Sequence, residues 1–281
     1  MVARRGKLYL CATPIGNLSD VTLRVLGALK DADLVAAEDT RRTRSLFSRY
    51  DIHTPLMSYR EQNRESAGRK IIERIEAGEK VALVSDAGMP GISDPGSHLV
   101  AACVEKGIDV EALPGPNAAL TALVISGLPT GRFSFEGFPP RKQGARRKLF
   151  EELAADPRTL IFYESPSRVA ATLADMLAVL GDRRAAVARE LTKRFEQVVR
   201  GTLSEVADEI GEPRGEYVLV IEGAPPPVPG EADLDDAARE VLFLNDDGMP
   251  LKEAAGNVSA AAGLSRTELY NRALTLRSRR P

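Results

Sequence analysis

The sequence predicts an α/β protein made of two α/β domains, with a small helical region at the C-terminus. The chain has 281 residues, enough for about two domains at roughly 150 residues each. Short β-rich runs alternate with helical patterns, which is typical of sheets covered by helices on both faces. A proline-rich stretch at 223–231 reads as an extended linker, and the sequence after it is helical. We place the domains at 1–117 and 118–224, and the linker with its helical tail at 225–281.

The first domain alternates strands and helices from its beginning. Ser19 and Asp20 can cap a first helix, whose apolar residues recur at helical spacing up to Leu29. Further helical patterns lie between the later β-rich runs. The predicted strands are 7–12, 34–37, 80–85 and 109–114, and the other predicted helices lie at 41–50, at 62–77 and after Gly96. This alternation predicts a mostly parallel sheet.

The pattern restarts in the second domain after residues 114–127. The predicted strands are 132–138, 159–164, 183–190, 195–201 and 215–223, with a basic helix between the first two. The last two are close enough in sequence to pair antiparallel, so we expect a mixed sheet. In the tail, a break at Gly263 and a cap at Ser265 separate two helices, the outline of a helix-turn-helix. A helical cap docked on the second domain explains the tail equally well.

Composition excludes several classes of protein. Apolar residues make up 43% and charged residues 28%, so neither a disordered chain nor a fibrous repeat is expected. Cys11 and Cys103 are far apart and lie in apolar patterns, which indicates buried thiols rather than a disulfide framework or a zinc site. Apolar runs stay well below the roughly 20 residues that span a bilayer, and Pro14 closes the N-terminal one. We therefore expect a cytoplasmic protein without a signal peptide or membrane contact.

Gly- and Pro-rich loops follow three of the predicted strands, at 13–20, 85–96 and 114–118. In an open α/β sheet the ligand crevice lies beyond the carboxyl ends of the strands, so these loops predict one shared binding site. The sequence lacks GxGxxG, GxxxxGK[ST], HExxH and GxSxG, and it has only two histidines. A dinucleotide dehydrogenase, a P-loop NTPase, a zinc protease, an α/β-hydrolase and a histidine-centred metal site are therefore not expected.

Seven segments resemble, in order, the ribosomal RNA small subunit methyltransferase I family, a branch of the tetrapyrrole methylase superfamily. They are LYLCATPIGNLSDVTLRVLGALKDADLVAAEDTRRT, SDAGMPGISDPG, PGPNA, FEGFPPR, FYESPSR, RELTK and GEYVLVIEG, which span nearly all of 7–223. The resemblance implies a homodimer that binds S-adenosyl-L-methionine in a cleft between its two α/β domains. The implied reaction is methylation of the ribose 2′-oxygen of a cytidine in the decoding region of small-subunit (16S) ribosomal RNA. The implied partner is that RNA or the 30S subunit.

The family pattern implies a set of cofactor-binding residues in the three loops and in the second domain. From the loops come residues that border the methionine and ribose portions, and from the second domain come neighbours of the adenine. They are Pro14, Asp86, Ala87, Gly88, Ile92, Ser93, Pro116, Asn117, Ala118, Tyr163, Leu191 and Tyr217.

Methyl transfer to a ribose hydroxyl needs a proton acceptor, because the neutral 2′-hydroxyl is a poor nucleophile. A side chain or a backbone group can fill that role. The candidate side chains are Glu38, Asp39, Glu164, Glu190 and Lys193, and each has an alternative role as a helix cap or in an ion pair. The preferred catalytic cluster is Glu38, Asp39, Arg41 and Lys193, with the choice of base left open.

The formal net charge of −2 does not point to a polyanion partner, but the positive charge is concentrated locally. Two basic runs lie beside the AEDTR and FEGFPPR motifs, where contact with RNA phosphates is expected. The predicted RNA-binding residues are Arg42, Arg44, Arg141, Lys142, Arg146, Arg147 and Lys148. The alternative for such a run is a solvated helix face.

Two other functions stay open at this point. One is a methyltransferase with the same fold and cofactor that acts on a tetrapyrrole or another small molecule. The other is a nucleic-acid-binding protein without catalytic activity, in which the helical tail and the basic runs carry the binding. Stoichiometric S-adenosylmethionine binding would separate the second from the enzymatic functions.

Overall fold

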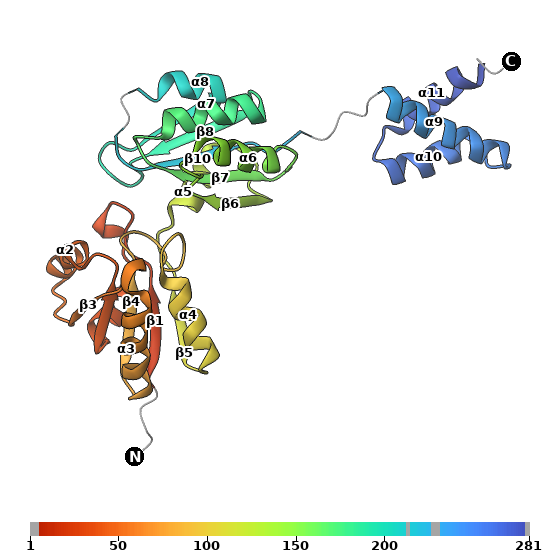
Figure 1. Cartoon of the computed structure of the whole chain (residues 1–281). Helices are drawn as coiled ribbons and strands as arrows, with labels where there is room; N and C mark the ends of the chain where they lie inside the picture. Colours follow the sequence, from red (N-terminus) through yellow and green to blue (C-terminus); the bar gives the residue numbers. More distant parts are fainter. Residues whose placement is uncertain (1–5, 212–213, 226–230, 279–281) are drawn as a thin grey trace. The chain divides into compact units, whose positions relative to one another are not determined.

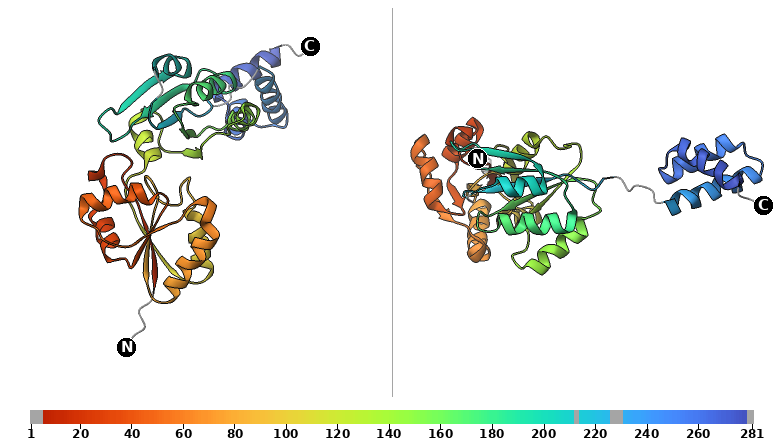
Figure 2. Two further views of the ribbon diagram at one scale, coloured as in Figure 1. Left: turned by 60° about the vertical axis from the view of Figure 1, so that its left-hand side comes forward. Right: turned by 90° about the horizontal axis from the view of Figure 1, so that it is seen from above.

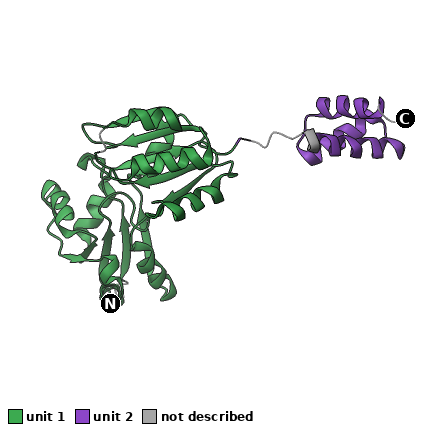
Figure 3. Cartoon of the chain, turned by 45° about the horizontal axis from the view of Figure 1, so that its top comes forward, with its two compact units in different colours: residues 1–224 green, residues 225–281 purple. Residues whose placement is uncertain are grey.

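The computed structural model describes residues 6–211, 214–225 and 231–278. The chain divides into two compact units, residues 1–224 and residues 225–281 (Figure 3). Most of the predicted linker at 223–231 lies outside the described residues. The first unit holds two separate five-stranded sheets, and the second is helical (Figure 1).

The first sheet is entirely parallel, with the strand order β3-β2-β4-β1-β5. Its strands are β1 (Lys7–Cys11), β2 (Leu34–Ala37), β3 (Leu56–Ser58), β4 (Lys80–Val84) and β5 (Asp109–Leu113). The parallel sheet is confirmed, and β3 is an additional edge strand that the sequence pattern did not predict. It has three half-buried residues, too few for an alternating pattern to emerge.

Helices cover both faces of this sheet, seen edge-on in the left view of Figure 2. They are α1 (Leu23–Asp31), α2 (Thr40–Tyr50), α3 (Arg64–Glu76) and α4 (Gly96–Glu105), with 3-10 turns at Leu18–Asp20 and Glu61–Asn63. Alternate residues of a strand enter different cores: Val35 packs with α1 and α2, whereas Leu34 packs with α3 and α4. Both cysteines are buried thiols, and burial raises the pKa of Cys103 to about 11.

The second sheet is mixed, with the strand order β6-β7-β10-β8-β9. Its strands are β6 (Phe133–Gly137), β7 (Thr159–Glu164), β8 (Arg184–Arg189), β9 (Gln197–Thr202) and β10 (Tyr217–Ile221). Only β6 and β7 pair in parallel. The expected direct pairing of the last two strands is wrong, because β8 lies between them and pairs antiparallel with both. The short connection from β8 makes β9 its hairpin partner, and β10 returns as a fully buried central strand.

One face of the second sheet is covered by α6 (Gln143–Leu153), α7 (Val169–Leu180) and α8 (Leu203–Glu209), around a core that includes Phe150 and Phe162. The other face is covered by α5 (Ala118–Ser126). The core beneath α5 also contains Ile15 from the loop after β1, so this loop packs against the second sheet. Through this contact, the carboxyl ends of the first sheet's strands face the second sheet.

The second unit consists of α9 (Glu231–Asp246), α10 (Leu251–Ala262) and α11 (Arg266–Ser278), with an apolar core of its own. Gly263 ends α10 in the left-handed conformation, and the Ser265 hydroxyl accepts the backbone N–H of Glu268 at 3.4 Å. The predicted helical C-terminal region is therefore confirmed. Across the described residues, none of the helices combines the length and apolar character that a membrane crossing requires.

Candidate active site

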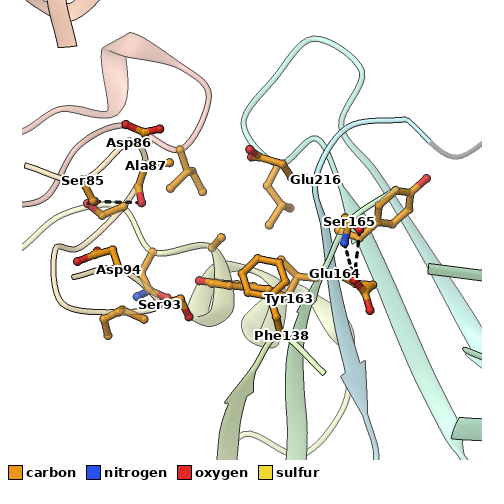
Figure 4. Close-up of a pocket in the computed structure, with 18 of the residues that line it drawn as sticks. Ser85, Asp86, Ala87, Ser93, Asp94, Phe138, Tyr163, Glu164, Ser165 and Glu216 are labelled. Atoms are coloured by element: carbon orange, nitrogen blue, oxygen red, sulfur yellow. Dashed lines mark hydrogen bonds between the residues drawn. The ribbon is translucent and has the colours of Figure 1, made fainter. Parts of the chain in front are cut away.

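A pocket of about 360 Å³ lies where the loops at the carboxyl ends of the first sheet meet the second sheet (Figure 4). The first sheet contributes the loop after β1, the start of α2 and the long loop after β4. The second contributes the start of α5 and the ends of β6, β7, β8 and β10. The lining residues are Ile15, Glu38, Arg42, Ser85–Asp94 except Pro90 and Gly91, Asn117, Ala118, Phe138, Tyr163–Pro166, Glu190, Leu191, Lys193 and Glu216–Val218.

The loop after β4 is held in place by backbone hydrogen bonds. Thr13 and Gly88 exchange both of their N–H···O bonds, at 2.9 and 3.0 Å, which ties this loop to the one after β1. Gly88 has a φ of +80°, a conformation that a side chain would strain. The Asp94 carboxylate accepts the N–H groups of Gly91 and Gly96, both at 2.8 Å. These contacts place the backbone of the loop along the pocket wall.

We call the part of the chain that contains the first sheet the first half, and the part that contains the second sheet the second half. Three carboxylates from the first half line the pocket: Glu38, Asp86 and Asp94. Asp86 accepts the backbone N–H of Asp39 at 2.8 Å and lies 3.6 Å from the Arg42 guanidinium. Burial and the nearby charge of Asp86 raise the pKa of Glu38. Burial also raises the pKa of Asp94, although backbone N–H groups oppose the shift. The site therefore has an excess of negative charge that a cationic ligand would neutralise.

Asp39 and Arg41, both predicted catalytic, lie beside the pocket rather than in its wall. Asp39 caps α2, accepting the Arg41 N–H at 2.9 Å, and its carboxylate also binds the Arg41 guanidinium at 2.8 and 3.1 Å. These hydrogen bonds hold the pKa of Asp39 well below its usual range. A carboxylate so strongly stabilised is a poor proton acceptor, so the helix-cap role accounts for Asp39.

The wall from the second sheet is aromatic. The Tyr163 ring meets Phe135 edge-on at 4.8 Å and Phe138 at 5.6 Å between centroids. The Tyr163 hydroxyl accepts the N–H of Ala119, at the start of α5. Figure 4 shows Tyr163 and Phe138 side by side, opposite Asp86 and Ala87. The second sheet thus adds an aromatic surface to a pocket whose charged residues come from both sheets.

Glu164 also lines the pocket, but its carboxylate is occupied within the protein. It is buried, accepts the Thr172 hydroxyl at 2.7 Å and the Ser165 N–H at 2.8 Å, and pairs with Arg168 at 3.2 Å. Arg168 in turn donates to the carbonyl oxygens of Pro139 and Pro140. These bonds make Glu164 an anchor for the loop after β6 rather than a base.

The predicted catalytic Lys193 pairs with Glu190 at 2.8 Å and lies 3.8 Å from Glu216. The Lys193 hydrogen bond lowers the pKa of Glu190, which also accepts the Glu216 N–H at 3.3 Å. Glu190 and Thr192 are left-handed at φ +52° and +66°, each of which costs about 1–3 kcal/mol. The Thr192 hydroxyl accepts the Asn17 N–H at 3.0 Å, so this strained loop connects the two halves.

Ten of the twelve predicted cofactor residues line the pocket. They are Asp86, Ala87, Gly88, Ile92, Ser93, Asn117, Ala118, Tyr163, Leu191 and Tyr217. Pro14 and Pro116 flank it: Pro14 precedes Ile15, and the Pro116 carbonyl lies 3.5 Å from where a side chain at Gly88 would begin. Of the four residues predicted to be catalytic, Glu38 and Lys193 line the pocket.

The predicted RNA-binding residues do not share one environment. Arg42 lines the pocket, and the others are exposed except for Arg146. Arg146 is buried, and its guanidinium binds Asp175 on α7, with an Nε–Oδ2 distance of 2.8 Å. Its assignment to RNA contact is corrected here, because a buried, ion-paired guanidinium is not available to a phosphate. Arg147 also binds Asp175, at 2.7 Å, but its side chain is half exposed.

Sequence reasoning missed several lining residues, notably Asp94 and Phe138. Both lie in motifs that it had identified. The signal for Asp94 was its position two residues before a Gly that opens a helix, where a carboxylate can accept backbone N–H groups. The signal for Phe138 was an aromatic residue placed just after a strand and before two prolines. In the part of the chain that the structure describes, we find no group of three or more His, Cys, Asp or Glu arranged to hold a metal ion.

Comparison with known proteins identifies relatives of the whole chain. Residues 7–207 match the family model of tetrapyrrole (corrin/porphyrin) methylases, and residues 231–277 match that of the RsmI C-terminal HTH domain. The chain is 46% identical over 272 residues to the ribosomal RNA small subunit methyltransferase I of Halalkalibacterium halodurans, covering 95% of this chain and 94% of the relative. It is 45% identical to that of Bacillus subtilis, with coverage of 95% and 93%.

Solved structures share the fold at lower identity. Uroporphyrin-III C-methyltransferase from Thermus thermophilus, complexed with S-adenyl homocysteine, is 22% identical with a TM-score of 0.55, covering 77% of this chain and 97% of that one. A diphthine synthase is 16% identical with a TM-score of 0.59, covering 77% and 89%. The predicted fold of two α/β halves is confirmed by these neighbours and by the two sheets.

Proposed function

Because the chain belongs to the ribosomal RNA small subunit methyltransferase I family, within the tetrapyrrole methylases, we propose that it methylates small-subunit ribosomal RNA with S-adenosylmethionine as the methyl donor. The proposed acceptor is the ribose 2′-oxygen of a cytidine in the decoding region. The observation that carries the proposal is the extent of the similarity: 45–46% identity spans 95% of the chain, including the helical C-terminal region.

The pocket fits S-adenosylmethionine in its chemistry. This cofactor supplies an electrophilic methyl group on a positively charged sulfonium. Glu38, Asp86 and Asp94 supply negative charge on one side, which favours a cationic ligand. Tyr163 and Leu191 supply an apolar wall suited to the adenine. We propose the ten lining residues predicted from the sequence as the cofactor-binding set, with Pro14 and Pro116 shaping it from behind.

Glu38 is the proposed proton acceptor. It lies in the pocket wall, and its pKa is raised by burial and by Asp86, so its carboxylate is more basic than an exposed one. The other candidates are engaged elsewhere: Asp39 by Arg41, Glu164 by Arg168 and Glu190 by Lys193. Lys193 is proposed to position the loop after β8, and Arg41 to keep Asp39 ionised.

RNA contact is proposed for the exposed cations of the two basic runs, of which Arg42 lines the pocket. The set is Arg42, Arg44, Arg141, Lys142, Arg147 and Lys148. These residues offer positive charge to phosphates without a burial penalty, and they would make binding dependent on salt.

We further propose a cytoplasmic homodimer. On α5, Leu120 and Val124 lie one helical turn apart, and 47% and 69% of their surfaces are exposed, which suits an apolar contact. The proposed boundary between the two α/β domains stays at 117/118, where Asn117 caps α5 and α5 packs against the second sheet. Light scattering of the wild-type protein and of Val124→Asp would test the dimer.

The experiment that tests the function uses the purified full-length protein with methyl-labelled S-adenosylmethionine. Three acceptors are offered: assembled 30S subunits lacking the modification, the corresponding protein-free RNA, and a tetrapyrrole. Mass spectrometry of nuclease fragments then locates the label. Label on a cytidine ribose supports the proposal. Label on the tetrapyrrole alone, or cofactor binding with transfer to none of the three, would contradict it.

A further inference from the structure

Phe138 is a large aromatic side chain that lines the pocket and yet is 54% exposed. Its neighbour Tyr163 is more buried and meets it edge-on, at 61° between the rings. The edge contact fixes one side of the Phe138 ring and leaves part of its surface open at the pocket (Figure 4). An exposed aromatic ring in a ligand-sized pocket is an arrangement that proteins use to stack a planar ligand.

The backbone that carries Phe138 is held rigidly. Arg168 donates to the carbonyl oxygens of Pro139 and Pro140, and its guanidinium is held by the buried Glu164 at 3.2 Å. Thr172 donates to the same carboxylate at 2.7 Å. Two consecutive prolines restrict the loop further. The ring is therefore presented in a fixed position before any ligand arrives, which lowers the entropy lost on binding.

The residues that follow Phe138 in the chain indicate what kind of planar ligand the ring receives. Arg141 and Lys142 follow the two prolines directly, and both are exposed. The Ser93 hydroxyl lies 3.7 Å from where a side chain at Gly137 would begin, so the loop after β4 approaches the end of β6. A ring in the pocket that is followed in the chain by two exposed cations suits a nucleotide, whose base enters the pocket while its phosphates stay outside.

We propose that Phe138 is the stacking platform for the nucleobase of the nucleotide to be methylated, drawn out of the RNA stack into the pocket. Arg141 and Lys142 bind the flanking phosphates, and Arg168 with Glu164 positions the loop. This inference rests on the proposed ribosomal RNA methylation and adds the residue that receives the base. Extraction of a base from its stack exposes the adjoining ribose to the methyl donor.

The test compares Phe138→Leu, Phe138→Tyr and the matched control Phe133→Leu. Phe133 is the first residue of β6, the strand that precedes Phe138, and it is 40% exposed but outside the pocket lining. Transfer of label to the active RNA acceptor is measured at varied acceptor concentration, and S-adenosylhomocysteine binding is measured by calorimetry. Loss of one base–aromatic stack lowers kcat/KM for the RNA by about tenfold or more. Phe138→Tyr retains the rate, Phe133→Leu matches wild type, and all variants bind S-adenosylhomocysteine alike.

Three results would overturn the inference. If Phe138→Leu matches wild type on RNA, the ring does not stack the base. If S-adenosylhomocysteine binding falls together with the RNA rate, the ring belongs to the cofactor site. If the wild-type protein methylates no RNA acceptor, the proposed function fails and the inference falls with it, whereas the first two results leave that function standing. Thermal unfolding of each variant verifies that the fold is intact.

Discussion

The two halves that meet at the pocket hold the carboxylates of the pocket wall in different ways. In the first half, Asp86 and Asp94 accept backbone N–H groups, with the Arg42 guanidinium 3.6 Å from Asp86, and burial raises the pKa of Asp94 and of Glu38. In the second half, the carboxylates are held by side-chain cations: Glu164 by Arg168 and Glu190 by Lys193. The Lys193 contact lowers the pKa of Glu190.

The difference follows from the two kinds of sheet. A parallel sheet ends in loops that open helices, where backbone N–H groups position a carboxylate without cancelling its charge. The second sheet is largely antiparallel, and its connections are fixed to one another by ion pairs between side chains. We infer that the first half supplies charge to the ligand, whereas the second supplies shape and rigid surface.

The largest expected effect comes from Glu38→Gln in the first half. Removing a general base lowers kcat by about 10²–10⁴-fold. Because the pKa of Glu38 is raised, the wild-type rate should increase with pH through a value above that of an ordinary glutamate, as the carboxylate loses its proton. That dependence should vanish in Glu38→Gln. The pKa of Asp39 is low in the wild-type protein, so Asp39→Asn should lose some activity through the weaker helix cap but keep the pH profile. An unchanged profile in Glu38→Gln would assign the base elsewhere.

The next largest effect is a loss of stability on substitution of Asp175, which lies in the second half. Burial acts to raise the pKa of Asp175, but hydrogen bonds from Arg147, Arg146 and Gln143 together lower it. Asp175→Asn leaves the buried Arg146 without its counter-charge and should cost about 3–5 kcal/mol in urea unfolding. Glu76→Gln, which breaks an ion pair with about half of each side chain exposed, should cost less than about 1 kcal/mol. Similar losses of unfolding free energy in the two variants would mean that the buried pair contributes no more than the exposed one.

A smaller effect is expected for the backbone of the loop after β4. Gly88→Ala places a side chain at φ +80° in the pocket wall, and S-adenosylhomocysteine affinity should fall by about tenfold, since left-handed strain costs roughly 1–2 kcal/mol. Gly107→Ala carries comparable strain at φ +67°, in open space away from the pocket. It should lower the free energy of unfolding by a similar amount and leave the affinity unchanged. Calorimetry on both separates loop geometry from general strain.

The smallest effect is expected from a single exposed cation of the proposed RNA-binding set. Lys142→Ala should weaken RNA binding a few-fold and reduce by about 1 the slope of log affinity against log salt concentration. Lys30→Ala is the control, because Lys30 is also exposed but lies at the end of α1, towards the amino ends of the parallel strands. Equal losses of RNA affinity in the two variants would mean that binding depends only on the total charge of the protein. Filter binding across a salt series makes the comparison.

Local patterns predicted most of the elements but not the order of the second sheet. The apolar runs at β2 and β7 have the predicted bounds, because each is a continuous buried segment between clear breaks. The insertion of β8 between β9 and β10 depends on pairing across long stretches of chain, which periodicity does not encode. Arg146 was misassigned within a basic run, although it lies one helical turn before the buried Phe150 and thus on the apolar face of α6.

By itself, the sequence determined which loops surround the pocket and which family the chain resembles, because both depend on residue types at short spacing. Only the tertiary structure decided which charges face the pocket and which are cancelled. Arg146 and Arg147 are neighbours in a single run, yet the first is buried against Asp175 and the second is half exposed. That outcome depends on a partner about thirty residues away on another helix. Burial and ion pairing are set by contacts distant in sequence, and these contacts raise the pKa of Glu38 and make Glu164 an anchor for its loop.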